Sequence, residues 1–139
     1  MQRVTLLCVG KLKEKFYAEA AAEYVKRLAR YCRLSIVELP EERLPENPSR
    51  AQIEAALAKE AENIRGKLPP ASGLIALCVE GREWSSEELA RRIEAWANAG
   101  EKQLVFLIGG SLGLHESVKA QAVEKLSMSP MTFPHHLAR

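Results

Sequence analysis

Cysteine is scarce in this 139-residue sequence, and the three cysteines present are not spaced as a framework. Cys8, Cys32 and Cys78 are odd in number and contain no C-x-x-C pair, which argues against a disulfide scaffold or a zinc ribbon. Two of them, Cys8 and Cys78, stand inside apolar segments typical of buried strands. We therefore predict buried, reduced thiols, as in a cytoplasmic protein. The histidines also lack metal-ligand spacing, so no metal is expected.

The sequence has no strong excess of charge and no long apolar run. Its formal net charge is +2 at pH 7, so composition alone does not predict a nucleic-acid partner, which would need a local patch. No apolar run approaches the roughly 18 residues of a membrane span. The start, Met1-Gln2-Arg3, leads directly into a strand without the layout of a signal peptide. We expect one cytoplasmic domain over residues 1–139, with no membrane contact.

Four segments have the composition of β-strands. Three of them are apolar almost throughout, which is typical of strands covered on both faces of a sheet, and one is shorter and more mixed. In chain order the four strands are expected at residues 4–9, 34–39, 74–79 and 104–108. Because helical segments separate these strands, the sequence predicts an α/β fold with a mainly parallel sheet and helices on both faces.

The segments between the strands carry helix signals. Residues 13–31 repeat apolar side chains every four positions. The repeat consists of Phe16, Ala20, Tyr24 and Leu28. Ser49 and Ser85 each begin a further helix, because Gln or Glu follows three residues later, as in a capping box. Gly100 predicts the end of the helix that Ser85 begins.

Two glycine turns follow strands of the predicted sheet. Gly109-Gly110-Ser111-Leu112-Gly113 comes after the strand at 104–108, and Glu80-Gly81 comes after the strand at 74–79. Such turns let the backbone approach a ligand closely. The first lacks both the dinucleotide and the P-loop spacing, so it also fits a plain connection. The second leaves open whether it faces a ligand or only makes a tight turn.

The nearly uncharged segment Met128–Phe133, with two methionines and Pro130, is the most unusual part of the sequence. One interpretation is a short buried edge strand that the proline interrupts. The other is a wall for a flat, partly apolar cofactor, since Pro130 stiffens the loop while neighbouring amides remain free to bind an adenine edge. With two glycine turns expected nearby, an adenosyl pocket is the sharper interpretation.

Few polar residues near this crevice suit catalysis or recognition. His135 directly follows the loop and is a candidate acid, base or orienting group, with a surface histidine at a helix start as the alternative. Lys11 to Lys15 follow the first strand and suit phosphate contacts with RNA, although such clusters usually form a solvated surface. Trp84 is either a base-stacking surface or, more simply, a side chain that packs against the third helix.

Four motifs, in this order, resemble one known family. They are Val9-Gly10-Lys11-Leu12-Lys13, Leu77-Cys78-Val79-Glu80-Gly81, Ile108-Gly109-Gly110-Ser111-Leu112-Gly113-Leu114-His115, and Leu126-Ser127-Met128-Ser129-Pro130-Met131-Thr132-Phe133-Pro134-His135. Together they resemble the RlmH (YbeA-type) family of SPOUT-class RNA methyltransferases. The resemblance runs from residue 1 to residue 139, and the last two motifs are the most specific in combination.

The resemblance implies an S-adenosylmethionine-dependent enzyme that methylates N3 of pseudouridine 1915 in 23S ribosomal RNA. It also implies a homodimer acting on assembled ribosomes or subunits, and an α/β knot whose C-terminal segment is threaded through a loop, a rare topology that no periodicity predicts. The family's cofactor pocket falls on Leu77, Gly109, Met128, Ser129, Pro130, Met131, Thr132 and Phe133. His135 is the candidate for orienting or deprotonating the pseudouridine. A non-catalytic flavodoxin-like nucleotide-binding domain and a plain RNA-binding module are the competing hypotheses.

The resemblance further implies an apolar helix and a tail ending in Tyr-His after the position of Arg139. Neither is in this sequence. Phe133-Pro134 resembles a helix start with proline at the first helical position, but only five residues follow Pro134, too few for a helix that is stable alone. From this we expect a truncated knot segment and weak cofactor binding.

Overall fold

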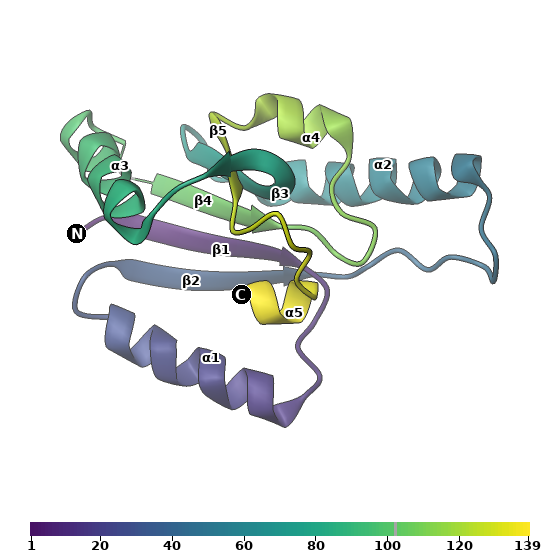
Figure 1. Ribbon diagram of the computed structural model, residues 1–139, viewed down its shortest axis with the longest axis horizontal. Coiled ribbons are helices and arrows are strands. Elements are labelled where there is room, and N and C mark those ends of the chain that lie inside the picture. Colours follow the sequence, from purple (N-terminus) through teal and green to yellow (C-terminus); the bar gives the residue numbers. More distant parts are fainter. Residues whose placement is uncertain (102) are drawn as a thin grey trace.

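The computed structural model describes residues 1–101 and 103–139 and contains a five-stranded, entirely parallel sheet (Figure 1). The strand order is β2-β1-β4-β3-β5. In chain order the elements are β1 (Arg3–Val9), α1 (Lys15–Leu28), β2 (Arg33–Leu39), α2 (Arg50–Lys67), β3 (Gly73–Glu83), α3 (Ser86–Asn98), β4 (Gln103–Ile108), α4 (Glu116–Gln121), β5 (Glu124–Ser127) and α5 (His135–Ala138). The predicted α/β class and parallel sheet are confirmed. Among the described residues, no helix is long and apolar enough to cross a bilayer.

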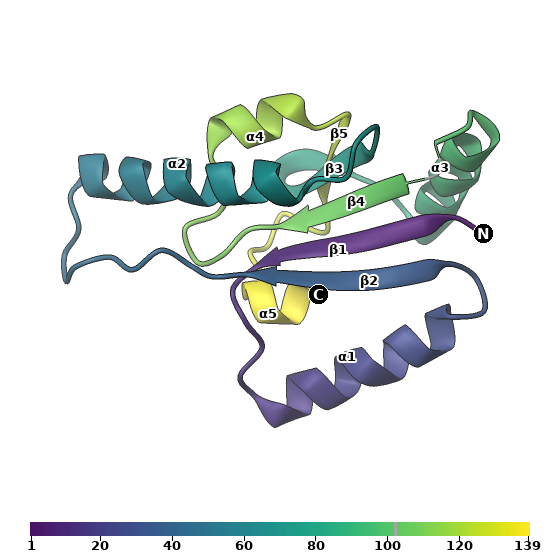
Figure 2. The same ribbon diagram turned by 180° about the vertical axis from the view of Figure 1, so that it is seen from behind.

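Helices cover both faces of the sheet, and each face has its own apolar core (Figures 1 and 2). Under α2 and α4, fully buried side chains such as Leu7, Leu107 and Ile64 form the larger core. On the opposite face, Ile75 and Leu104 lie under α3. Burying one such side chain contributes about 1.5–3 kcal/mol relative to its exposure. The predicted helices on both faces are therefore present, with unequal cores.

Helix α1 runs alongside β2 (Figures 1 and 2), and no side chain in it is fully buried. The apolar repeat predicted this helix, but its members turn away from the sheet: Phe16 is 64% exposed and Tyr24 is 62% exposed. The neighbouring row of Tyr17, Ala21 and Val25 is the partly buried one. The helix therefore presents an apolar row to its surroundings.

The helix caps explain where α2 and α3 begin and end. Ser49 forms the predicted capping box: its Oγ accepts from the N–H of Gln52 at 3.1 Å, and the Gln52 side chain accepts from the N–H of Ser49 at 2.8 Å. Ser85 forms only half of a capping box. Its Oγ accepts from the N–H of Glu88, but the Glu88 carboxylate binds arginines of its own helix instead of the N–H of Ser85. Such a cap contributes about 1 kcal/mol. Gly100 follows α3 with φ of 91°, as predicted for a C-terminal stop.

Strand β3 is longer than predicted, because it continues beyond residue 79 and curls around β5. Leu126 of β5 pairs with Leu77 and again with Arg82, so residues 78–81 leave the ladder and then return to it. Figure 1 shows β5 passing through this curl. A Cβ atom at Gly81 would lie 2.7 Å from the carbonyl carbons of Lys125 and Leu126. Gly81 therefore lies where the curl of β3 contacts the backbone of β5. A tight turn at this position fits the knot that the resemblance implies.

The strand order also separates this fold from a flavodoxin-like one. Flavodoxin-like sheets follow the order 2-1-3-4-5, whereas here β4 inserts between β1 and β3, and β5 forms the far edge. A chain that reverses in this way places the loops after β3, β4 and β5 beside one another. The flavodoxin-like hypothesis is therefore wrong for the fold.

We predict that Gly81→Ala destabilises the protein by roughly 1–3 kcal/mol, because the added methyl group would force the curl away from the β5 backbone. Urea unfolding followed by circular dichroism measures the change. Gly66→Ala is the matched control, since a Cβ there meets nothing within 4 Å and the residue lies in α2, so a gain of roughly 0.5–1 kcal/mol is expected. Equal stability of Gly81→Ala and the parent protein would contradict the close crossing.

Candidate functional site

Three neighbouring strands reach the same level of the sheet where β4 ends, β5 nears its end and β3 begins its curl. Leu77 of β3 pairs with Ile108 of β4 on one side and with Leu126 of β5 on the other. The residues that follow these three therefore begin three adjacent loops: the curl of β3, the glycine turn after β4, and the segment after β5. Ligands of open α/β sheets bind at such carboxyl ends, where the strand order reverses.

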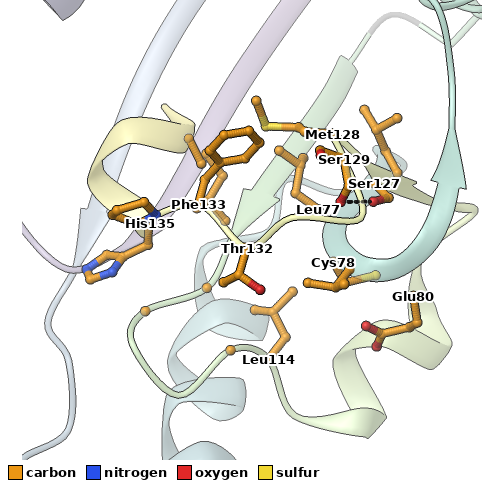
Figure 3. Close-up of a pocket in the computed structure, with 18 of the residues that line it drawn as sticks. Leu77, Cys78, Glu80, Leu114, Ser127, Met128, Ser129, Thr132, Phe133 and His135 are labelled. Carbon is orange, nitrogen blue, oxygen red and sulfur yellow. Dashed lines mark hydrogen bonds between the residues drawn. The ribbon is translucent and has the colours of Figure 1, made fainter.

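These loops enclose a cavity of about 580 Å³, within the roughly 300–1,000 Å³ of small-molecule sites (Figure 3). It brings together all of the residues expected to contact a cofactor except Pro130. They are Leu77, Gly109, Met128, Ser129, Met131, Thr132 and Phe133. Pro130 lies in the same segment but does not line the cavity. Segments some fifty residues apart in the sequence thus share one rim.

The segment after β5 forms an open, apolar wall of this cavity. Strand β5 ends at Ser127, so the edge-strand interpretation of residues 128–133 is wrong. The backbone turns at Pro130: the N–H of Met131 donates to Ser129 Oγ at 3.0 Å. Met128, Met131 and Phe133 all remain more than two-fifths exposed. Large apolar side chains in that position offer a surface for a partly apolar ligand.

The glycine turn after β4 supplies backbone to the cavity but does not suit a phosphate. A Cβ at Gly109 would approach the carbonyl oxygen of Gly113 to 2.5 Å, so only glycine fits. The N–H and the hydroxyl of Ser111 both donate to the carboxylate of Glu41, at 2.7 and 3.0 Å. A phosphate at this turn would have to displace a carboxylate of like charge. The structure therefore agrees with the sequence, whose turn lacks the P-loop spacing, in giving no support to phosphate binding here.

One end of the cavity carries a pair of opposite charges that the sequence did not single out. Lys119 of α4 donates to Glu80 of the β3 curl, and both residues line the cavity. Burial is the largest single influence on the pKa of Lys119 and lowers it, but the hydrogen bonds and charges of Glu80 and Glu116 together outweigh burial and leave that pKa raised. The same hydrogen bond lowers the pKa of Glu80. Both groups are therefore charged at neutral pH.

His135 lies at the other end of the cavity (Figure 3). It is the first residue of α5, and Pro134 precedes the helix rather than standing at its first position. Its Nε2 atom is buried without a hydrogen-bond partner among the described residues and lies 4.0 Å from the Glu41 carboxylate. Burial, with help from His136, lowers the pKa of His135. A neutral imidazole at neutral pH follows.

Helix α5 is fixed by Arg139. Its guanidinium donates to Glu38 at 2.6 Å and also to the carbonyl oxygen of Gly10, and its side chain is only 3% exposed. Glu38 accepts a further hydrogen bond from the N–H of Leu12 at 2.8 Å. The hydrogen bond from Arg139 lowers the pKa of Glu38. These bonds join α5 to the loop after β1, whose lysines at 11 and 13 are exposed and lie outside the cavity lining.

Other residues with possible functions have structural roles. His115 caps α4 by accepting from the N–H of Ser117 at 3.2 Å. Trp84 packs against Trp96 with ring centroids 6.3 Å apart, which confirms the simpler interpretation of this residue. The three cysteines are free, and burial raises the pKa of Cys8 to about 11. Among the described residues, no group of three or more metal ligands converges.

Comparison with known proteins identifies the family. A family model described as "Predicted SPOUT methyltransferase" matches residues 2–139. The chain belongs to the SPOUT methyltransferase family. The expected family and the expected class of enzyme, a methyltransferase, are thereby confirmed.

Two relatives are similar over nearly the whole chain. A protein of Pelotomaculum thermopropionicum named "Ribosomal RNA large subunit methyltransferase H" is 48% identical over 139 residues, which cover all of this chain and 87% of the relative. A protein of the same name from Leuconostoc mesenteroides subsp. mesenteroides is 44% identical over 136 residues, which cover 98% of this chain and 86% of the relative. The similarity to these relatives therefore includes the four motifs and extends along the whole chain.

We predict that Glu38→Gln destabilises the protein near pH 7 and that the loss vanishes in acid. The pKa of Glu38 is lowered in the folded state, so its stabilising effect is present above its unfolded pKa and disappears as the pH falls through its folded pKa. Urea unfolding of both proteins at about pH 7 and about pH 3 tests this. Glu19→Gln, which removes an exposed pair with Lys15, should change stability by less than roughly 0.5 kcal/mol. A pH-independent difference for Glu38→Gln would contradict the proposed ion pair with Arg139.

Proposed function

We propose that this protein is an S-adenosylmethionine-dependent methyltransferase that acts as a homodimer on N3 of pseudouridine 1915 in the 23S RNA of cytoplasmic ribosomes. Residues 1–139 would act as one domain. The main support is the cavity in which Leu77, Gly109 and the segment 128–133 share one rim. The names of both relatives, which describe a methyltransferase of large-subunit ribosomal RNA, support the choice of substrate.

The cavity fits S-adenosylmethionine in size and in chemistry. Met128, Met131 and Phe133 would contact the flat adenosyl group, while the backbone at Gly109 approaches it closely. Lys119 and Glu80 would pair with the carboxylate and the ammonium of the amino-acid end. When bound, the cofactor supplies an electrophilic methyl group on a sulfonium. The residues of the chain contribute mainly by positioning, which accounts for much of the rate in such displacements.

The substrate nitrogen must lose its proton, and His135 is the group we propose for this step. N3 of pseudouridine carries a hydrogen that is lost when the methyl group is gained. A neutral imidazole at the cavity can accept that proton, and its lowered pKa keeps it neutral near pH 7. The exposed lysines of the loop after β1 lie next to α5 and would bind RNA phosphates.

The apolar row on α1 supports the proposal of a homodimer. Phe16, Tyr24 and Leu28 are exposed along one helix face, and Ile36 of the neighbouring β2 is 37% exposed. Several large apolar side chains exposed along one helix are typical of interaction sites in soluble proteins. We propose that a second copy of the chain covers it.

The cofactor assignment predicts selective stabilisation by S-adenosylhomocysteine, the reaction product. A thermal shift that rises with S-adenosylhomocysteine concentration, but not with FMN or NAD, is expected, because a ligand that binds only the folded state raises the melting temperature. Cys78 lines the cavity, so alkylation of Cys78 should slow in the presence of the ligand. Alkylation of Cys32, which lies outside the cavity lining, is the internal control. Stabilisation by FMN or NAD instead, or unprotected Cys78 at saturating S-adenosylhomocysteine, would contradict the assignment.

The catalytic assignment predicts that His135→Ala lowers single-turnover methylation of large ribosomal subunits about 100-fold or more, the usual contribution of a general base. Binding of S-adenosylhomocysteine, measured by calorimetry, should remain within a few-fold of the parent protein. His136→Ala is the neighbouring comparison: it removes a residue that lowers the pKa of His135 but none that lines the cavity, so turnover should fall far less than in His135→Ala. Near-normal turnover by His135→Ala would remove His135 from the mechanism.

A further inference from the structure

We propose that Glu41 is a positioning residue for His135, selecting the tautomer in which Nε2 carries the hydrogen and Nδ1 is the basic nitrogen. This inference rests on the proposed role of His135 in proton transfer. Glu41 belongs to the loop between β2 and α2. Its carboxylate reaches the boundary of the cavity, where it meets residues of three other segments.

The carboxylate of Glu41 is held in a defined orientation. Its Oε1 atom accepts two hydrogen bonds from Ser111, from the N–H at 2.7 Å and from the hydroxyl at 3.0 Å. This leaves Oε2 for the imidazole, whose Nε2 lies 4.0 Å away. The separation exceeds a hydrogen bond, as is common for catalytic pairs before substrate binds. One oxygen therefore anchors the group, and the other faces His135.

Two glycines leave room for this pair. A Cβ at Gly10, after β1, would lie 3.4 Å from His135 Nε2 and 3.5 Å from Glu41 Oε2. A Cβ at Gly110, after β4, would overlap Glu41 Oε1. A side chain at Gly110 would push the carboxylate out of place, whereas a Cβ at Gly10 would be in ordinary contact with both groups, at a backbone φ of 106° that favours glycine. The ends of two strands of the sheet are thus shaped around the contact.

The burial of Nε2 decides which tautomer the contact favours. Nε2 is fully buried and has no hydrogen-bond partner among the described residues. If it carried a lone pair, it would face a carboxylate of the same sign, whereas an N–H group there is attracted. Nδ1 is not among the buried, unpartnered atoms of the described chain, and we assign it as the nitrogen that receives the proton. The same logic orients the histidine of an Asp-His pair in serine hydrolases.

The pair has a consequence for the proposed proton transfer. The N3–H bond of the base breaks, its proton bonds to Nδ1 of His135, and the electron pair stays on N3 as the nucleophile for the methyl group. The imidazolium that results faces Glu41. The negative charge of Glu14 also favours the protonated form of His135. His136 and Arg139 oppose the positive charge, as does burial. Glu41 is the anion whose oxygen lies 4.0 Å from the ring nitrogen, so it stabilises the charge that develops.

The test is the Glu41→Gln variant, because the glutamine oxygen can still accept both hydrogen bonds from Ser111 while the charge is removed. Long-range ¹H–¹⁵N spectra of protein with ¹⁵N-labelled histidine report the tautomer and the titration of His135. We expect the Nε2–H tautomer to dominate in the parent protein, and we expect Glu41→Gln to lose that preference and to titrate at lower pH. In methyl transfer, kcat should fall at least about 10-fold, with its acid limb moved to lower pH and with KM for the RNA unchanged.

Glu42→Gln is the matched control, since this neighbour on the same loop faces Lys59 at 3.9 Å. Ser111→Ala provides a second variant that removes one anchor of the carboxylate and keeps its charge, and it should weaken the tautomer preference partially. Spectra of Glu41→Gln that match the parent protein, or an equal change in Glu42→Gln, would overturn the inference. Failure of the proposed function would be seen separately, as absence of methyl transfer by the parent protein, because the spectra need neither cofactor nor RNA.

Discussion

The passage of β5 through the curl of β3 is the constraint on which the rest of this structure depends. Leu126 is paired twice by the same strand, at Leu77 and at Arg82, and Gly81 leaves no space between the curl and the threaded backbone. Once β5 is held there, the segment that follows must emerge beside the glycine turn after β4. The cavity is therefore a result of topology. Its walls come from segments that no local interaction would bring together.

The elements determined by local interactions could be predicted from the sequence, and those determined by the crossing could not. Three continuous apolar segments, one more mixed segment and the Ser49 cap were sufficient for four strands and the start of α2. Strand β5 was missed because Glu124 to Ser127 contains one apolar residue, Leu126, and owes its conformation to the strand around it. The extension of β3 was missed for the same reason, since residues 80–83 are polar or glycine. Periodicity predicted α1 but not which of its apolar rows is buried, because an apolar repeat does not reveal which partner it faces.

The candidate site, too, could be predicted from the sequence only in part. The family motifs located the backbone turns and the apolar wall, and the structure brings all of these residues except Pro130 to one cavity. The ionic groups were not foreseen. Glu80, Lys119 and Glu41 carry no sequence pattern of their own, because each acquires its partner from a segment far along the chain. Charge pairing of that kind depends on the completed fold, so composition and spacing do not contain it.

The two ends of the cavity differ in a way that, under the proposed function, would matter for the transfer of a methyl group from a sulfonium. At one end, Lys119 and Glu80 are both charged and neutralise one another, and a zwitterionic ligand would separate them. At the other end, His135 is neutral because it is half-buried beside His136. A neutral base does not repel the positive charge of a sulfonium, whereas an imidazolium would. Once the base has taken a proton, however, it needs a counter-charge, and Glu41 is already held in place by Ser111 to provide it. Under the proposed function, burial keeps the base neutral before the reaction, and a preorganised carboxylate stabilises it afterwards.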